Sequence, residues 1–430
     1  MHLENIASYG RRRARRHCFA SLLVLLLVPL DAVSAVLSRE SLTIQEAMAV
    51  AFAENPEFAA ARWEADIAKG LIIQAASLPN PELSVSVEDT RRESSLTSVE
   101  LTQPIELGGK RRARTAFAER DRDAALIETE QKINELRSAV IHAFYSALRA
   151  QEAFELSGKA VELATRGVAV AQGRVTAGKA SPMEATRAQL ELSDIQLKME
   201  SARFELENAY SMLALVGGQG APFFKSVEGS FEALPALPAS EIILSRVEGV
   251  PEVRLARMNI LRAEANVGVE KAERIPTVSL SVGSQYDRAL GQRVNLVGVS
   301  VPLPLFNRNR GALLSAARGA DQARDIGQAA ELRMRTEVRR TLEQWEYAKR
   351  EVHSLNTRLL PDSENALEGA VRGFEMGKFA LIDVLDAQRT FFAVQSRYMD
   401  ALGRAIDAWV KLEKIYGVEL GVELDAEFDR

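Results

Sequence analysis

One pattern occurs twice in this chain, and it limits the possible folds more than any other feature. Residues 178–189 read GKASPMEATRAQ and residues 377–388 read GKFALIDVLDAQ, so both stretches begin with Gly-Lys and end with Ala-Gln. Self-similarity at a fixed offset indicates a duplicated structural unit. We therefore expect a first repeat at about 41–217 and a second at about 240–417, joined by a Gly- and Pro-rich linker at 218–239.

Each repeat carries the apolar pattern of long packed helices. Over 126–175, apolar residues recur in alternating steps of three and four, which predicts a coiled-coil helix at about 108–176. A second such pattern covers 188–216, and the corresponding positions in 387–415 are apolar again. The same register in both copies favours two tandem repeats of long antiparallel coiled-coil hairpins.

The Gly-Lys stretches mark the points where the chain reverses between two helices. Glycine is favoured just after a helix end, and proline is favoured at the first position of the next helix. We place the hairpin tips at about 176–183 and 375–382. The tip residues singled out are Gly178, Lys179, Gly377 and Lys378.

Four short stretches between the helices alternate apolar with small polar residues. They cover about 81–89, 98–105, 276–286 and 294–303. This alternation fits strands of a membrane barrel, and ordinary half-buried hairpins are the alternative. Four strands cannot close a barrel and open edges are not tolerated in lipid, so a membrane location would require several chains, three of which supply twelve strands. The expected fold class is mainly α with a small β part.

The N-terminus has the pattern of a secretory signal peptide. Arginines at 11–16 precede a short apolar run, and small residues lead up to Ala35, which predicts a signal peptide at 1–35, with a retained anchor helix as the alternative. Without these residues the chain carries 49 basic and 57 acidic residues, a net charge of -8, which argues against a nucleic-acid partner. The C-terminal tail is expected at 418–430.

The chain contains few residues suited to catalysis or metal binding. Its single cysteine, Cys18, lies in the predicted signal peptide, so the exported protein is expected to lack thiol chemistry. His142 and His353 are the only histidines beyond that segment, and neither has ligand spacing around it. No Ser-His-Asp or Cys-His pattern is present. The sequence therefore predicts no enzyme, no catalytic residue, no metal site and no cofactor.

The duplicated unit, the hairpin tips and the stretch QPIELGGKRR at 103–112 resemble the TolC-type outer-membrane efflux proteins. The stretch TQPIELGGKR at 102–111 most resembles the corresponding sequence in the branch that serves cobalt-zinc-cadmium and related heavy-metal exporters. The resemblance covers about 41–417. It implies a homotrimer with a twelve-stranded barrel in outer-membrane lipid and a helical tunnel through the periplasm. The implied partners are a periplasmic adaptor (membrane fusion protein) and a proton-driven inner-membrane pump of the resistance-nodulation-division type.

The resemblance also implies a gate at the periplasmic end of the tunnel. The stretch LIDVLDA at 381–387 places its acidic residues at Asp383 and Asp386, whereas Glu184 and Arg187 break this pattern in the first repeat. The tips would dock on the adaptor. Alternatives are a channel for drug efflux or type I protein secretion and, from another class, a soluble periplasmic coiled-coil scaffold or adaptor.

Overall fold

A computed structural model describes residues 39–89, 91, 93–230 and 236–420, which belong to one structural unit. The predicted signal peptide at 1–35 and most of the predicted tail lie outside the described residues. Within the described ranges, no helix is both long enough and apolar enough to cross a membrane.

The elements of the first repeat follow the order that the sequence predicts, with one very long helix. Helix α3 has 67 residues, which corresponds to a length of about 100 Å. It begins after Gly109, whose φ is 74°, a conformation that favours glycine. The elements are β1 (Arg39–Leu42), α1 (Ile44–Glu54), α2 (Pro56–Ala76), β2 (Glu82–Glu88), β3 (Leu96–Ile105), α3 (Lys110–Thr176) and α4 (Pro182–Val216).

The second repeat has the same order, but its long helix is interrupted. A π-helical turn separates α7 from α8, where α3 continues without a break. The elements are β4 (Phe224–Val227), α5 (Ser240–Ser245), α6 (Pro251–Glu273), β5 (Val278–Asp287), β6 (Gln292–Ser300), α7 (Arg310–Ser354), the π turn (Leu355–Leu359), α8 (Leu360–Glu375) and α9 (Leu381–Tyr416). A final 3₁₀ turn covers Gly417–Leu420.

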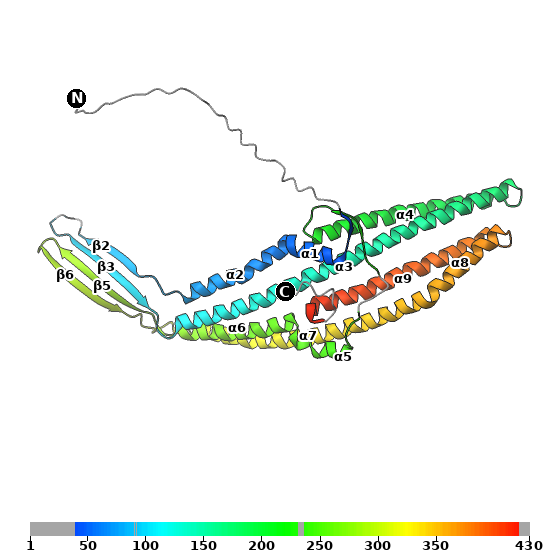
Figure 1. Cartoon of the computed structure of the whole chain (residues 1–430). Coiled ribbons are helices and arrows are strands. Elements are labelled where there is room, and N and C mark those ends of the chain that lie inside the picture. Colours follow the sequence, from blue (N-terminus) through cyan, green and yellow to red (C-terminus); the bar gives the residue numbers. More distant parts are fainter. Residues whose placement is uncertain (1–38, 90, 92, 231–235, 421–430) are drawn as a thin grey trace, which may run out of the picture. The chain divides into compact units, whose positions relative to one another are not determined.

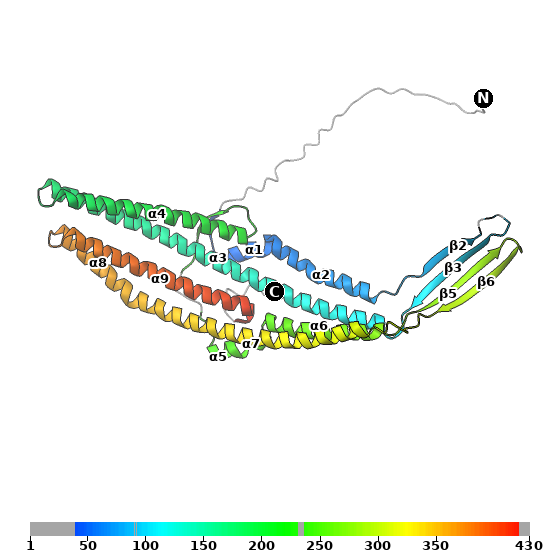
Figure 2. The ribbon, with the colours of Figure 1, turned by 180° about the vertical axis from the view of Figure 1, so that it is seen from behind.

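The helices pack side by side, with α3 between α4 and α9. Helix α9 packs in turn against α7 and α8, and the shorter helices α2 and α6 lie along α3. Figures 1 and 2 show the α3–α4 hairpin and the α8–α9 hairpin running alongside each other, with both tips at the same end. We call them hairpin one and hairpin two. This arrangement confirms the expected mainly α fold of long antiparallel hairpins.

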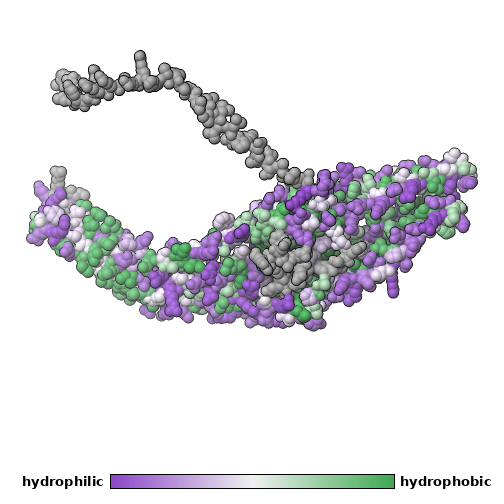
Figure 3. Space-filling model, in the orientation of Figure 1, coloured by the Kyte–Doolittle hydropathy of each residue, from purple (hydrophilic) through white to green (hydrophobic). Residues whose placement is uncertain are grey.

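The four predicted strands form one antiparallel sheet in the order β2-β3-β5-β6. Its inner pairing joins the two repeats, because Leu101 of β3 lies opposite Val282 of β5. Its outer strands, β2 and β6, come from different repeats and have no further strand beside them in the described part of the chain. Apolar side chains remain exposed on the sheet, for example Val85 at 64% and Val297 at 78% (Figure 3).

The linker contains a strand that the sequence analysis did not predict. Strand β4 pairs in parallel with β1, so that Arg39 lies opposite Phe224. Gln151 of α3 holds β4 in place, since its amide Nε2 donates to the Val227 carbonyl at 3.2 Å and its Oε1 accepts from the Val227 N–H at 2.9 Å. The joint between the repeats is therefore attached to the middle of α3.

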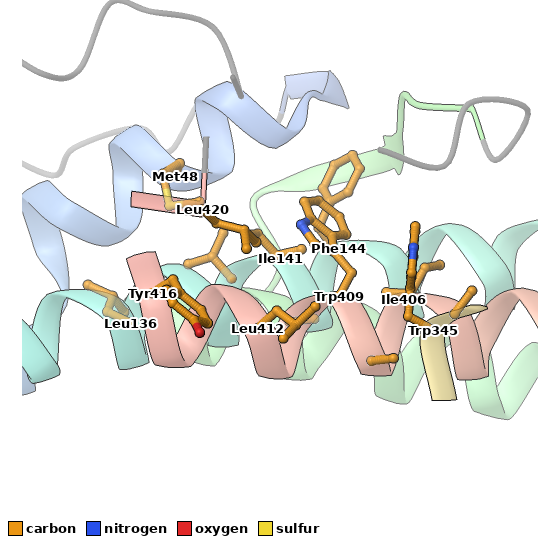
Figure 4. Packing of buried hydrophobic residues seen from close by; sticks show 14 of the residues in the cluster. Met48, Leu136, Ile141, Phe144, Trp345, Ile406, Trp409, Leu412, Tyr416 and Leu420 are labelled. Carbon is orange, nitrogen blue, oxygen red and sulfur yellow. The ribbon is translucent and has the colours of Figure 1, made fainter. Parts of the chain in front are cut away.

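Two separate clusters of buried apolar residues hold the helices together. The central cluster contains the large side chains Phe144, Trp345 and Trp409, each 1% exposed (Figure 4). The tip cluster is built mostly from smaller residues of both hairpins, namely Ala160, Ala164, Val168, Ala171, Ala188, Leu192, Ile195, Ala370, Phe374, Leu381 and Val384. The repeated apolar pattern has nine positions in the first copy, each with a counterpart 199 residues later, and none of these residues is exposed, which confirms the pattern. The first-copy positions are Ala188, Leu192, Ile195, Met199, Ala202, Leu206, Ala209, Leu213 and Val216.

Candidate functional site

The tip of hairpin one is a compact turn closed by backbone hydrogen bonds. Gly178 has a φ of 68°, and the Lys179 N–H donates to the Arg174 carbonyl at 2.8 Å, which satisfies the end of α3. Ser181 then caps α4, because its hydroxyl accepts from the Met183 N–H at 3.3 Å. Lys179 is left exposed at the end of the hairpin.

The tip of hairpin two repeats this turn with different side chains. Gly377 has a φ of 71°, and the Lys378 N–H donates to the Gly373 carbonyl at 2.8 Å. The Phe379 ring lies against Gly373, so closely that a Cβ at that position would overlap the ring. Lys378 is exposed, like Lys179 in hairpin one.

The two candidate gate carboxylates lie on the first turns of α9. Asp383 and Asp386 are three residues apart and both are exposed. Asp383 also has a local role, since its Oδ2 accepts from the Ala380 N–H at 2.8 Å and so caps the helix. Their counterparts in the first repeat differ: Glu184 forms an ion pair with Arg174, with 3.3 Å between Oε1 and Nε.

Two polar contacts join the hairpins near these carboxylates. Arg389 of α9 donates through Nη2 to Glu191 Oε2 of α4 at 2.9 Å, although the arginine remains 66% exposed. The hydrogen bond to Glu191 raises the pKa of Arg389, and the negative charges of Asp194 and Asp386 add to this effect. The candidate gate residue Asp386 therefore lies close enough to interact electrostatically with the arginine that contacts the neighbouring hairpin.

The second contact is between a cation and an aromatic ring. The guanidinium of Arg174 in α3 lies 4.8 Å from the centre of the Phe374 ring in α8. Phe374 is itself buried in the tip cluster. A single arginine thus contacts Glu184 on its own hairpin and Phe374 on the other.

The hairpins do not fill all of the space between them. A cavity of about 50 Å³ lies at their junction, lined by residues of α3, α4, α8 and α9. Gln388 lines it and is 3% exposed, and its amide Nε2 has no hydrogen-bond partner. The junction of the hairpin tips is therefore neither fully packed nor fully apolar.

Neither histidine of the described chain lies in a group that could hold a metal ion. Among the described residues, no three His, Cys, Asp or Glu side chains converge on one point. His142 instead pairs with Asp407, with 3.4 Å between Nε2 and Oδ1, and connects α3 to α9. The first turns of α3 are rich in basic residues, two of which are paired: Lys110 donates to Glu273 at 2.8 Å, and Arg114 pairs with Glu106.

The sequence analysis identified both tips and both carboxylates but did not identify the residues that join the hairpins. Arg389 directly follows the repeated Ala-Gln pair, and Glu191 lies two residues after the first copy's pair. Opposite charges at these nearly equivalent positions were the available signal. This signal is weak, because charged residues on exposed helix faces are common.

The family model described as outer membrane efflux protein matches this chain twice, over residues 48–219 and 247–418. The cobalt-zinc-cadmium resistance protein CzcC of Cupriavidus metallidurans is 37% identical over 376 residues, which cover 87% of this chain and 90% of that protein. These findings confirm the predicted resemblance and its heavy-metal branch. They also favour an efflux channel over the alternative of a periplasmic scaffold or adaptor.

Solved structures with a similar fold include the outer-membrane channel OprN, with a TM-score of 0.74 and 19% identity over 88% of this chain and 90% of that one. The outer membrane protein VceC of Vibrio cholerae has a TM-score of 0.72 and 18% identity over 89% of this chain and 97% of that one. At these identities the likeness supports the fold alone. The family matches, which include both repeats, show that this chain belongs to the outer membrane efflux protein family.

Proposed function

We propose that this protein is a passive trimeric conduit that exports heavy-metal cations such as cobalt, zinc and cadmium across the outer membrane. The observation that carries the proposal is the 37% identity to CzcC over most of both chains. The conduit catalyses no reaction and uses no cofactor. It conducts its cargo without holding it tightly.

The wall of the conduit in the membrane is a barrel of twelve strands, four from each of three copies. Two features of the sheet support this arrangement: its outer strands β2 and β6 are open, and apolar side chains such as Val85 and Val297 are exposed on it. Lipid tolerates strands only in a closed barrel, where no edge is left unpaired. The long hairpins continue this wall into the periplasm.

The predicted signal peptide at 1–35 directs the chain to export. A periplasmic adaptor docks on the hairpin tips, where Gly178, Lys179, Gly377 and Lys378 lie exposed. An inner-membrane pump of the resistance-nodulation-division type delivers the cargo. Because the conduit is passive, selection among metals, drugs or proteins takes place mainly in that pump.

Asp383 and Asp386 form the periplasmic gate. Three copies bring six carboxylates near one ring, which attracts cations and repels anions. The exposure of both side chains and their spacing of three residues support this role. Opening consists of an outward movement of hairpin two when the adaptor binds.

The cargo is tested by growth and localisation. Cells that lack this protein should stop growing at lower concentrations of cobalt, zinc and cadmium. Cells in which the protein is expressed again should recover the original resistance. In fractionated cells the protein should appear in the outer membrane as a heat-resistant trimer. If metal resistance is unchanged and drug resistance is lost instead, the cargo is a drug. If metal resistance is unchanged and a secreted protein is lost instead, the cargo is a protein.

The gate is tested by single-channel recording of the purified trimer. The double variant Asp383→Asn with Asp386→Asn removes the charge while the asparagine oxygen can still cap α9. We expect its preference for cations to fall. Glu184→Gln, at the position equivalent to Asp383 in the first repeat, should keep the preference. If the double variant conducts like the wild type, the gate assignment is wrong.

A further inference from the structure

One face of the sheet is apolar across all four strands. Leu83 of β2, Leu101 of β3, Val282 of β5 and Val297 of β6 lie opposite one another in the strand register. They are 66%, 44%, 48% and 78% exposed. Residues that lie directly opposite one another in a sheet point to the same face. In the barrel of the proposed function, this is the face that contacts lipid.

Exposed apolar side chains continue beyond the sheet, in the loop that leads to α7. Pro302 and Pro304 follow strand β6, and they cannot extend it because proline has no N–H to donate. Leu303, Leu305 and Phe306 lie in the same loop and are 74%, 63% and 100% exposed. We call these three residues the rim. No side chain of the described chain covers the rim, so it is available to a partner.

The rim lies where the membrane meets the periplasm in the proposed conduit. Strands β5 and β6 have ten and nine residues, and about 9–11 residues suffice for a strand that crosses a membrane. The sheet therefore crosses the hydrocarbon layer without the rim. The rim follows at the end of the sheet that adjoins the helices (Figures 1 and 2). Since the helices extend into the periplasm, we place the rim level with the headgroups of the periplasmic leaflet.

Three arginines lie next to the rim. Arg308 and Arg310 follow it directly at the start of α7, and Arg274 lies at the C-cap of α6. The two helix ends are held together, because the Asn309 amide Nδ2 donates to the Glu270 carbonyl at 3.1 Å and to Glu270 Oε2 at 2.6 Å. We call the three arginines the basic group.

No acidic side chain of the described chain neutralises the basic group. All three arginines are exposed, and none of them forms an ion pair with a described residue. The acids at the end of α6 have other partners, since Glu270 is bound as above and Glu273 accepts from Lys110 at 2.8 Å. Arg308 donates through Nε to the Pro304 carbonyl at 3.3 Å, which leaves its two Nη groups for another partner. The chain as a whole has a net charge of -5, so this local positive charge does not follow from its composition.

We propose that the basic group binds the phosphates of anionic phospholipids in the periplasmic leaflet, while the rim inserts its apolar side chains among the headgroups. The inference rests on the trimeric conduit of the proposed function, in which each copy supplies three guanidinium groups. A guanidinium binds two phosphate oxygens at once, and basic clusters beside a membrane attract anionic lipids. The two contacts together fix how deeply the barrel sits in the membrane.

Lipid binding to the purified full-length trimer in detergent tests the proposal. Fluorescent phosphatidylglycerol, which is anionic, is titrated into the trimer, and phosphatidylethanolamine, which has no net charge, serves as the comparison lipid. The triple variant Arg274→Gln with Arg308→Gln and Arg310→Gln should bind phosphatidylglycerol about tenfold more weakly than the wild type. Phe306→Ser should also weaken binding, because it removes the largest apolar side chain of the rim.

The matched control removes the same charge far from the membrane. Arg339, Arg340 and Arg350 are exposed residues of α7, and Arg339 lies about 44 Å along the helix from Arg310. The variant Arg339→Gln with Arg340→Gln and Arg350→Gln should bind phosphatidylglycerol as tightly as the wild type. The heat-resistant trimer is measured for every variant. If the triple variant forms none, Arg310→Gln alone should show a smaller loss of affinity in the same direction.

Several results would overturn the inference while the conduit stands. One is equal affinity of the basic-group variants and the control variant for phosphatidylglycerol. Another is a wild-type trimer that binds phosphatidylethanolamine as tightly. A third is displacement of the lipid by an equal concentration of inorganic phosphate, which would show a site for the free anion. If the wild-type chain forms no heat-resistant trimer in the outer membrane, the proposed function fails and the inference fails with it.

Discussion

The central cluster and the tip cluster join largely the same long helices in opposite ways. In the central cluster, Trp345 and Trp409 are buried to 1% exposure, and the carboxylate of Glu413 is fully buried against Arg137. In the tip cluster alanine is the most common residue and a cavity remains. The ion pair that joins the hairpins there, Arg389 with Glu191, has an arginine that is 66% exposed. The comparison shows that the same helices can be packed tightly at the central cluster and loosely at the tip cluster, where the two hairpins could separate.

The boundary between these two regions differs between the hairpins. Helix α3 passes from the central to the tip cluster without interruption, whereas the second repeat has a π turn at Leu355–Leu359 followed by Pro361. Proline has no N–H to donate and its ring clashes with the carbonyl four residues earlier, so the wider π turn accommodates it. The equivalent residue in α3 is Glu162, which has neither effect. Hairpin two therefore has a place to bend that hairpin one lacks.

The largest expected effect is the loss of the buried ion pair of the central cluster. Glu413 is 0% exposed, burial raises its pKa, and Arg137 opposes that rise through an Nε–Oε2 contact of 3.2 Å. Arg137→Ala leaves a buried carboxylate without its partner, which costs about 3–5 kcal/mol. The midpoint of thermal unfolding of the trimer should fall clearly, and conductance per intact channel should not change.

A second substitution shows whether the buried charge is the cause. Glu413→Gln in the Arg137→Ala background removes the charge and retains an oxygen that can accept from Trp409 Nε1, so it should recover much of the lost stability. Lys132→Ala, which removes an exposed ion pair with Glu135, serves as the surface control. If Arg137→Ala lowers the midpoint of thermal unfolding no more than Lys132→Ala does, the buried ion pair does not stabilise the central cluster.

The next effect concerns the contact between the hairpin tips and appears in conductance rather than stability. Arg389→Glu places two carboxylates where Arg389 and Glu191 now pair. Because the arginine is largely exposed, the change in unfolding free energy should stay within about 1 kcal/mol. The repulsion should separate the tips, and single-channel recordings should show a higher conductance of the trimer at rest.

The matched control removes an exposed ion pair that lies within one helix. Arg372→Glu breaks the pair with Glu368 on α8 and should leave conductance unchanged. The charge swap Arg389→Glu with Glu191→Arg should restore the low resting conductance. If Arg389→Glu and Arg372→Glu conduct alike, the tip contact does not hold the hairpins closed.

Helices and strands whose apolar residues recur at a regular spacing could be predicted from the sequence. The apolar periods of 188–216 and 387–415 predicted which residues are shielded, because a helix brings such positions to one face whatever it packs against. The strand alternation predicted β2, β3, β5 and β6 for the same reason.

Features that depend on how the repeats meet could not be predicted in this way. Arg389 and Glu191 are 198 residues apart, and only the packing of the hairpins decides which of many surface charges face each other. The four-residue strand β4 is too short for an alternating pattern, and it forms because β1 and Gln151 provide its hydrogen bonds. The helix-capping role of Asp383 was also missed, since it depends on the conformation of the Ala380 backbone.

The smallest expected effect is a pH dependence where α3 and α9 meet beside the central cluster. The hydrogen bond with Asp407 raises the pKa of His142 above its ordinary value near 6.5, although partial burial and the charge of Arg149 oppose this rise. The pair therefore stabilises the fold below pH 6.5, and its contribution is lost as the pH rises through the raised pKa. Both side chains are more than half exposed, which limits the contribution to about 1 kcal/mol or less. His142→Gln should therefore lower the thermal midpoint slightly at pH 6 and not at pH 8.5, whereas any loss in Lys132→Gln should be equal at both. A loss in His142→Gln that is the same at both pH values would show that the pair contributes through packing and not through charge.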